Sequence, residues 1–216
     1  MTDFESLNYL TLILTGAWVT VQLTAAGIVV ALIVAFVAGF GRLSKFRALQ
    51  FLSVIYIEFF RGTSIFVQLF WAYFVLPFLG IPLSPFETGV IVLGFNVGAY
   101  GAEVVRSAIL AVPREQWEVC TALNMKPFKR MTRIILPQAI PIMLPTFGNN
   151  AVELLKGTAV VSLISISDLT FQAQVARSQT GDTVIPFLGI LVIYYVLSLF
   201  LARFVKIMEN LYNRGR

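Results

Sequence analysis

The sequence predicts an all-α integral membrane protein with five transmembrane helices, an N-terminus outside the cytoplasm and a C-terminus inside it. Of its 216 residues, 58% are hydrophobic and only 12% are charged, and the mean hydropathy is +0.84. A soluble domain carries about 25% charged residues. Half that share leaves too few polar groups for a water-covered surface. The long uncharged stretches and the distribution of Lys and Arg then give the number of helices and their orientation.

The predicted spans are long stretches that lack charge, because a membrane-crossing helix needs about 20 apolar residues. No charged residue lies between Glu5 and Arg42, or between Arg61 and Glu87. The second of these stretches ends in the turn-rich segment LPFLGIPLSP. Reading the whole chain in this way places the five spans at about 12–40, 62–79, 86–109, 137–165 and 184–204.

Residues 46–60, FRALQFLSVIYIEFF, are apolar but are flanked by Arg47 and Arg61. One helix over 46–78 is too long for a single simple crossing, and two crossings would need a tight turn at Arg61 and Gly62. We therefore expect an interfacial or steeply tilted lead-in to the second span.

The orientation follows from the enrichment of Lys and Arg in cytoplasmic loops. With the loop after the first span in the cytoplasm, that side holds Arg42, Lys45, Arg47, Arg106, Arg114, Lys126, Lys129, Arg130, Arg133, Arg203, Lys206, Arg214 and Arg216. The opposite side holds Asp3, Glu5, Glu87, Asp168 and Asp182, with only Arg177 opposing them.

A charged segment, WEVCTALNMKPFKRMTRIILPQ, lies in the cytoplasmic loop expected at about 110–136. Pro113 suits a helix start, and the helix dipole favours the acidic Glu118 in its first turns. Asn124 stands where a helix end favours a left-handed residue, and Pro127 can begin a second helix. The segment predicts a helix–turn–helix at the cytoplasmic face. A solvated basic loop that only sets topology is the alternative.

Polar residues inside the membrane are costly and usually functional. Two predicted spans carry polar residues at i, i+4, i+7 spacing, which places them on one helix face. Such stripes facing a shared cavity could hold a zwitterion. They consist of Asn96, Tyr100 and Glu103 on the third span, and of Asn149, Glu153 and Lys156, with the adjacent Asn150, on the fourth.

Simple ion pairing is the alternative for several of these charges. The candidate pairs are Glu153 with Lys156, Glu103 with Arg106 near the cytoplasmic boundary, and Glu58 with Arg61. Three prolines, Pro137, Pro141 and Pro145, remove backbone donors at the start of the fourth span. Such loosened backbone suits a helix beside a pathway, or a kink that only serves packing.

Several functional classes are disfavoured by what the sequence lacks. It has no histidine and a single cysteine, Cys120, so the commonest base and metal ligand are missing and no internal disulfide can form. It has no G-x-x-x-x-G-K-[ST] phosphate-binding motif. We expect no catalytic residue, metal or cofactor on this chain. Because basic membrane loops explain the net charge of +5, we expect no nucleic-acid partner.

The charged segment resembles the EAA loop of ABC-importer permease subunits, whose pattern is Glu-Ala-Ala, a later Gly and then Ile/Leu-x-Leu-Pro. The matching residues are Glu118-Val119-Cys120, Ala122-Leu123-Asn124-Met125 and Ile134-Ile135-Leu136-Pro137. Neighbouring segments resemble the polar amino-acid branch of that family, and the resemblance runs from about residue 16 to 205. They are FFRGTSIFVQLFWAYFVLP (59–77), AYGAEVVRSAI (99–109), PREQWE (113–118) and LPTFGNNAVELLKGTAVVS (144–162).

The resemblance implies a single ABC transmembrane type-1 permease domain over 1–216, multi-pass in a bacterial inner membrane. It implies import of a polar amino acid or related zwitterion delivered by an extracytoplasmic substrate-binding protein. A second permease chain, identical or homologous, and ATP-binding ABC subunits that use ATP would complete the importer. The residues expected to couple to those ATPase subunits are Glu118, Val119, Cys120, Ala122, Leu123 and Asn124.

Some positions depart from the family pattern. Val119 and Cys120 replace alanines, Asn124 replaces the glycine, Ser64 replaces a common proline, and Gly157 and Ala159 fall in a usual KDTS. The substrate therefore stays open among basic, acidic and neutral amino acids and compatible solutes such as ectoine. The alternative function is a secondary transporter for small zwitterions, which predicts internal repeats and ion-coupling acids near the midplane.

Overall fold

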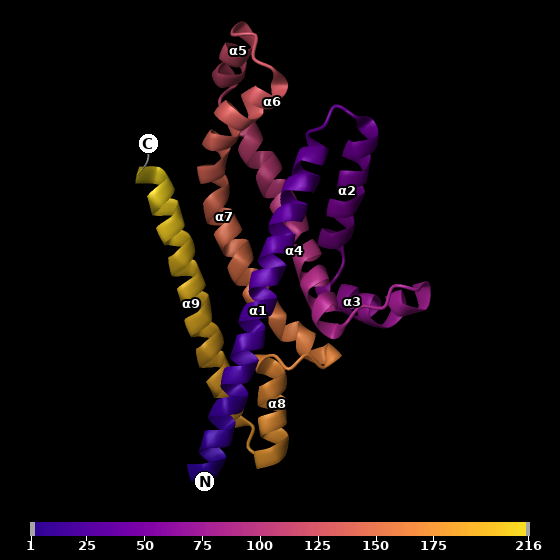
Figure 1. Cartoon of the computed structure of the whole chain (residues 1–216), viewed down its shortest axis with the longest axis vertical. Helices are drawn as coiled ribbons and strands as arrows, with labels where there is room; N and C mark the ends of the chain where they lie inside the picture. Colours follow the sequence, from indigo (N-terminus) through magenta and orange to yellow (C-terminus); the bar gives the residue numbers. More distant parts are fainter. Residues whose placement is uncertain (1–2, 215–216) are drawn as a thin grey trace.

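The computed structural model describes residues 3–214, with side chains over 11–212, and every regular element in that part is helical (Figure 1). The predicted all-α class is therefore confirmed for the described residues. The main helices are α1 (Asp3–Arg42), α2 (Arg47–Gly62), α3 (Ile65–Phe70), α4 (Pro85–Leu110), α5 (Arg114–Ala122), α6 (Pro127–Arg130), α7 (Leu136–Gly157), α8 (Leu169–Thr180) and α9 (Val184–Arg214). π-helical turns at Trp71–Val75 and Met131–Ile135, and 3-10 turns at Leu76–Leu79 and Thr158–Ile164, extend α3, α6 and α7.

Three described helices, α1, α4 and α9, are each long and apolar enough to cross a membrane. Two further pairs of helical segments pass the same test together but are bent, by 107° between α2 and α3 and by 50° between 127–164 and α8. The described chain thus offers three to five spans. The helices α1, α4 and α9 occupy the ranges expected for the first, third and fifth spans, and α7 with its 3-10 turn occupies that of the fourth.

The region of the second span consists of two helices with a sharp bend between them. Residues 47–62, expected as an interfacial or steeply tilted lead-in, form α2, which packs against α1 and α4 and buries Ser53 and Ile57. The helix ends at Gly62, because Thr63 and Ser64 are extended, and α3 then leaves at a steep angle (Figure 1). The break at Thr63 and Ser64 thus lies next to residue 62, where the second span is expected to begin. Arg61 and Gly62, where the sequence would allow a tight turn, stand directly before this break.

The centre of the fold is the close pair α1 and α4, and glycines of α4 make that approach possible. A Cβ atom on Gly94 would lie 2.6 Å from Val30, and one on Gly101 would lie 2.8 Å from Ala35. In lipid, no hydrophobic driving force brings apolar helices together, so their association depends on close van der Waals packing. Small residues such as glycine allow the two backbones to approach closely enough for it. Against this pair packs α7, and α9 lies outermost, against α7 and α8 (Figure 1).

The helix α7 continues through the prolines at its start. Pro141 has no N–H to donate to the carbonyl of Pro137, four residues earlier. The Tyr212 hydroxyl of α9 donates to that carbonyl instead, at 2.9 Å. A neighbouring helix therefore satisfies the backbone group that the proline frees, which is how membrane helices tolerate proline.

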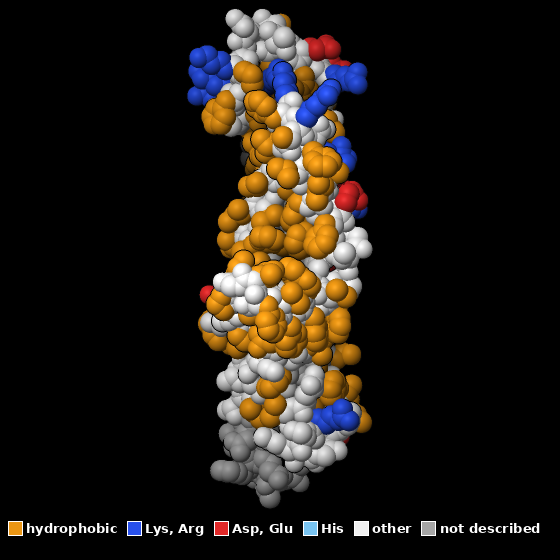
Figure 2. All heavy atoms as spheres, turned by 90° about the vertical axis from the view of Figure 1, so that its right-hand side faces the viewer, with side chains coloured by type: hydrophobic (Ala, Val, Ile, Leu, Met, Phe, Trp, Pro, Cys, Tyr) orange, Lys and Arg blue, Asp and Glu red, His pale blue; other side chains and the backbone are white. Residues whose placement is uncertain are grey.

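Charged and apolar side chains separate along the molecule. On the face turned to the viewer in Figure 2, Lys and Arg gather at the end where α5 and α6 lie, and hydrophobic side chains cover the middle. This matches the grouping of basic residues from which the orientation is predicted; the orientation itself stays a prediction.

Candidate functional site

The turn after α5 has the geometry that the sequence predicts. Asn124 has φ 50°, in the left-handed region. Its N–H donates to the carbonyl of Thr121 at 2.9 Å, and the Met125 N–H donates to that of Cys120 at 3.0 Å. These two bonds form a Schellman motif, in which Asn often replaces Gly. The left-handed Asn124 and the start of α6 at Pro127 confirm the helix–turn–helix.

The helix α5 projects at one end of the molecule and offers an exposed surface (Figure 1). Five of the six residues expected to couple to an ATPase subunit are exposed: Glu118, Val119, Ala122, Leu123 and Asn124. The sixth, Cys120, is only 2% exposed and faces the bundle. The family pattern does not distinguish the inward from the outward positions of this helix, so it could not separate Cys120 from the five exposed residues.

Side-chain contacts tie α5 to the segment that leads into α7. The Arg130 guanidinium lies over the Trp117 ring, 5.1 Å from its centroid. The Gln138 Nε2 donates to the Gln116 Oε1 at 3.3 Å. α6, the π-helical turn and α7 follow one another without a break, so these contacts connect α5 with the start of α7.

A charge cluster joins α1, α2 and α4 near the basic end of the bundle. Glu103 accepts from Arg106 at 2.7 Å, as the sequence predicts, and also pairs with Arg42 at 2.7 Å. Arg42 lies 3.9 Å from Glu58 as well. The candidate pairing of Glu58 with Arg61 is absent from the ion pairs of the described residues. The Arg61 guanidinium instead lies over the Tyr100 ring, 5.3 Å from its centroid.

Asn96 forms part of a buried amide network at the break between α2 and α3. Its Nδ2 donates to the Phe60 carbonyl at 3.0 Å and to the Gln68 Oε1 at 3.1 Å. The Gln68 Nε2 in turn donates to the same carbonyl at 3.0 Å and to the Thr63 hydroxyl at 2.7 Å. Asn96 therefore has protein partners in this conformation and supports the break.

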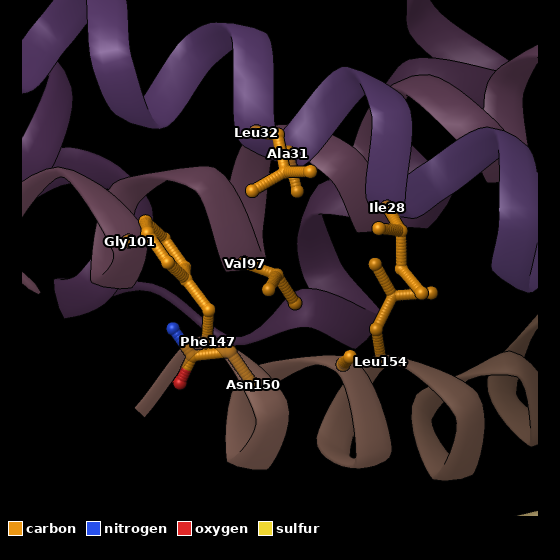
Figure 3. Close-up of a pocket in the computed structure, with 9 residues that line it drawn as sticks. Ile28, Ala31, Leu32, Val97, Gly101, Phe147, Asn150 and Leu154 are labelled. Atoms are coloured by element: carbon orange, nitrogen blue, oxygen red, sulfur yellow. The ribbon is translucent and has the colours of Figure 1, made fainter. Parts of the chain in front are cut away.

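The α7 residues of the predicted pathway point in three directions. Asn149 and Glu153 are exposed. Asn150 lines a cavity of about 20 Å³ between α1, α4 and α7, where its buried Nδ2 has no hydrogen-bond partner (Figure 3). Lys156 lines a groove of about 830 Å³ between α7 and α9. The expected pairing of Glu153 with Lys156 is absent from the ion pairs of the described residues.

The two predicted stripes do not share a cavity within one chain. Asn96 and Glu103 contact groups of α1, α2 and α3, whereas the α4 residues that meet α7 around the small cavity are Val97 and Gly101 (Figure 3). The spacing placed the stripe on one face of α4 correctly. Which neighbour that face meets depends on the packing, which the spacing does not contain.

Asp168, which the sequence predicts only as a charge on the external side, is a buried carboxylate that holds α8 in place. Asp168 is fully buried, and its Oδ1 accepts from the Phe171 N–H at 2.9 Å as an N-cap. The Tyr194 hydroxyl of α9 donates to Oδ2 at 3.3 Å. The Leu169 N–H donates to the Thr20 hydroxyl of α1 at 3.2 Å. The N-cap residue before LTFQAQ was the available signal.

Comparison with known proteins identifies the class. A family model described as "Binding-protein-dependent transport system inner membrane component" matches residues 11–214. The chain is 44% identical over 207 residues to "Probable amino-acid ABC transporter permease protein y4tF" of Sinorhizobium fredii, covering 93% of this chain and 87% of that one. It is 32% identical to "L-cystine transport system permease protein TcyB" of Bacillus subtilis, with coverages of 92% and 86%.

Solved structures agree with the sequence comparisons. The chain superposes on an amino acid ABC transporter crystallised with histidines with a TM-score of 0.88 at 33% identity, over 97% of this chain and 99% of that one. A structure of the MetNI methionine ABC transporter gives a TM-score of 0.78 over 98% and 99%, and at 18% identity shows the fold alone. Fold and relatives thus define an ABC-transporter permease. The chain belongs to the family of binding-protein-dependent transport system inner membrane components.

Proposed function

We propose that this chain is the permease subunit of an ATP-driven importer for a polar amino acid or a related zwitterion. The observation that carries the proposal is the exposed α5 with its left-handed Asn124, at the position of the family's EAA loop. The names of relatives that transport L-cystine and glutamine support the amino-acid class. None of the matches supports a stand-alone secondary transporter.

The proposal treats the whole chain, 1–216, as one permease domain in a bacterial inner membrane. Five spans result when each of the two bent pairs counts as one. The end that carries α5, α6 and most Lys and Arg then faces the cytoplasm, as basic loops do, and the N-terminus lies outside.

In the proposed mechanism α5 docks into a cytoplasmic ATPase subunit. Glu118, Val119 and Leu123 supply an exposed surface of one charge and two apolar groups. Since the chain lacks a phosphate-binding loop, the partner subunits bind and use ATP. When two such subunits close, the pull on α5 passes through α6 to α7 and tilts the bundle. The buried Cys120 packs α5 against the bundle, and in this mechanism it takes no part in the contact with the ATPase subunit.

A second permease chain, identical or homologous, completes the pathway. In the single chain Asn149 and Glu153 are exposed. Glu153 takes part in none of the ion pairs of the described residues. Membrane helices bury such groups against protein or water. We place Tyr100, Asn149 and Glu153 on the substrate pathway, with Asn150 and Lys156 at its edges. Asn96 and Glu103 support it from within the bundle. An extracytoplasmic binding protein delivers the substrate.

The proposal is tested with Glu118→Arg in the complete importer reconstituted in proteoliposomes. Reversing this exposed charge is expected to abolish association with the ATPase subunits and ATP-dependent amino-acid uptake. Gln174→Arg, an exposed position on α8 at the opposite end, is the control and is expected to retain both. A Glu118→Arg importer that assembles and transports like the wild type would disprove the coupling role. Unchanged rate and selectivity in Glu153→Gln would exclude Glu153 from the pathway.

A further inference from the structure

Arg61 is an exposed cation at the far end of α2, and none of the ion pairs of the described residues gives it a carboxylate. It lies in the last turn of α2, fourteen residues after Arg47, or about 21 Å along the helix from its basic end. The ion pairs among the described residues involve Arg42, Glu58, Glu103 and Arg106, and Arg61 is not one of them. Ionisable groups this far along a membrane helix from its basic end usually line a substrate or ion pathway.

The surroundings of Arg61 orient its guanidinium and leave its N–H groups available. The nearest acid on its helix, Glu58, lies toward Arg42. The guanidinium stacks over the Tyr100 ring, and both side chains are exposed, Tyr100 at 38%. A Cβ atom on the adjacent Gly62 would meet nothing within 4 Å. Stacking on a ring engages the face of the guanidinium, so the edge that carries its N–H donors stays free.

The backbone that carries Arg61 is held in place by buried hydrogen bonds. Gln68 of α3 and Asn96 of α4 both donate to the Phe60 carbonyl, one residue before Arg61. The Thr63 hydroxyl donates to the Phe59 carbonyl at 2.7 Å. The end of α2 is thus fixed where the helix breaks, and a fixed donor set loses less entropy when it binds a ligand.

Arg61 and Tyr100 lie on the side of α4 that faces away from α1. Gly94, Gly98 and Gly101 approach α1. With about 100° per residue, Tyr100 points roughly 130° away from their mean direction. On α7, Phe147 and Leu154 contact residues of α1, and Asn149 points roughly 150° from their mean direction.

Tyr100 of α4 and Asn149 of α7 lie at about the same height along the bundle. Gly101 and Val97 of α4 line one small cavity with Asn150 of α7 (Figure 3). Tyr100 and Asn149 are the chain neighbours of two of these residues. The exposed polar groups of α2, α4 and α7 therefore gather at one level, on the face that α1 leaves uncovered.

We infer that Arg61, held against Tyr100, is the residue of this chain that binds the carboxylate of the transported amino acid. The inference rests on the proposed function and adds a contact to it. The guanidinium presents two parallel N–H donors that match the two oxygens of a carboxylate. In a site of low dielectric this pairing is stronger than in water. Every α-amino acid carries the group, so the contact serves the substrate class and not one side chain.

The first test uses the complete importer in proteoliposomes and ATP-dependent uptake of radiolabelled L-glutamine, L-cystine and the other protein amino acids. Arg61→Gln is expected to lower uptake about tenfold or more, as loss of a charged hydrogen-bond pair implies. Arg61→Lys should retain part of it. Arg47→Gln, an exposed cation at the start of the same helix, is the control and should retain full uptake. Assembly and melting temperature of the complexes are expected to be unchanged.

The second test asks whether the Arg61 position faces water and substrate or lipid. The sole native cysteine of this chain, Cys120, is buried, so Arg61→Cys introduces one accessible thiol on the permease, and the unsubstituted importer treated with the same reagents is the control for thiols of its other subunits. We expect aminoethyl methanethiosulfonate to restore a positive charge and uptake, the negatively charged sulfonatoethyl reagent to restore neither, and the transported amino acid to protect the thiol. Protection by anionic phospholipid vesicles instead of the amino acid would identify a lipid phosphate site and overturn the inference.

The experiments distinguish a failure of the proposed function from a failure of the proposed carboxylate site. If the wild-type importer takes up none of the amino acids, the proposed function is wrong. If the wild type transports but Arg61→Gln transports equally well, the function stands and the carboxylate site is wrong. A parallel fall in melting temperature and uptake that the methanethiosulfonate reagent does not reverse would show a structural role and also overturn the inference.

Discussion

The Nδ2 of Asn96 lies 3.1 Å from the Oε1 of Gln68, and both amides donate to the carbonyl of Phe60. This pair joins α4 to the point where α2 ends and α3 begins. A helix end inside the bundle leaves carbonyls without intrahelical partners. The amide pair supplies donors to them, so the 107° bend is a stabilised feature of the fold.

Removing the amide pair tests that relationship. Asn96→Leu and Gln68→Leu should each destabilise the protein by about 1–3 kcal/mol, because each leaves buried polar groups without a partner. The double variant should cost less than the sum, with a coupling of about 1 kcal/mol. Thermal unfolding of the purified complex measures the cycle, and strict additivity would mean that the two amides act independently.

The charge cluster predicts a different response at its two acids. Glu103→Gln removes the acid that pairs with both Arg42 and Arg106 and should cost about 1–3 kcal/mol. Glu58→Gln is the matched control, since its side chain is 64% exposed and lies 3.9 Å from Arg42. It should change stability by less than about 1 kcal/mol. Equal shifts in melting temperature for both variants would show that Glu103 contributes no more to the charge cluster than Glu58.

The turn after α5 predicts opposite effects of two substitutions at one residue. Asn124→Gly should be neutral or slightly stabilising, because glycine adopts a positive φ freely. Asn124→Val should cost about 1–2 kcal/mol, because a β-branched residue is strained there. The melting temperature reports the strain, and stimulation of ATP hydrolysis by the loaded binding protein reports the coupling. Full stimulation in Asn124→Val would show that the turn geometry is dispensable.

Close packing of α1 and α4 predicts a contrast between two glycines. Gly94→Ala would bring a Cβ atom to 2.6 Å from Val30 and should destabilise the protein by about 1–3 kcal/mol. Gly157→Ala would place its Cβ atom 3.5 Å from Leu93, an ordinary contact. It should be neutral or stabilising, because alanine favours helix more than glycine. A melting temperature unaffected by Gly94→Ala would show that α1 and α4 can move apart at little cost.

The successful predictions from sequence rest on local causes. A left-handed Asn124 followed by Pro127 is decided by backbone preferences within a few residues. The pairing of Glu103 with Arg106 follows from i, i+3 spacing on one helix. The all-α class follows from hydropathy, since a membrane core admits backbone only with its hydrogen bonds satisfied. Family membership was carried by short motifs in their order along the chain.

The side-chain partners that the sequence did not predict depend on contacts between distant segments. The sequence offered Glu58 and Arg61 as a candidate ion pair, whereas Arg42 of another helix approaches Glu58 and the Arg61 guanidinium lies over the Tyr100 ring of α4. It also offered Asn96 as a residue of the substrate pathway without the partners that its amide has here, the Gln68 Oε1 and the Phe60 carbonyl. Periodicity states which residues share a face but not what that face meets. The sequence by itself determined the helices, the turn and the family. Only the tertiary structure decided the partners, because residues far apart in the chain compete for the same charges and hydrogen bonds.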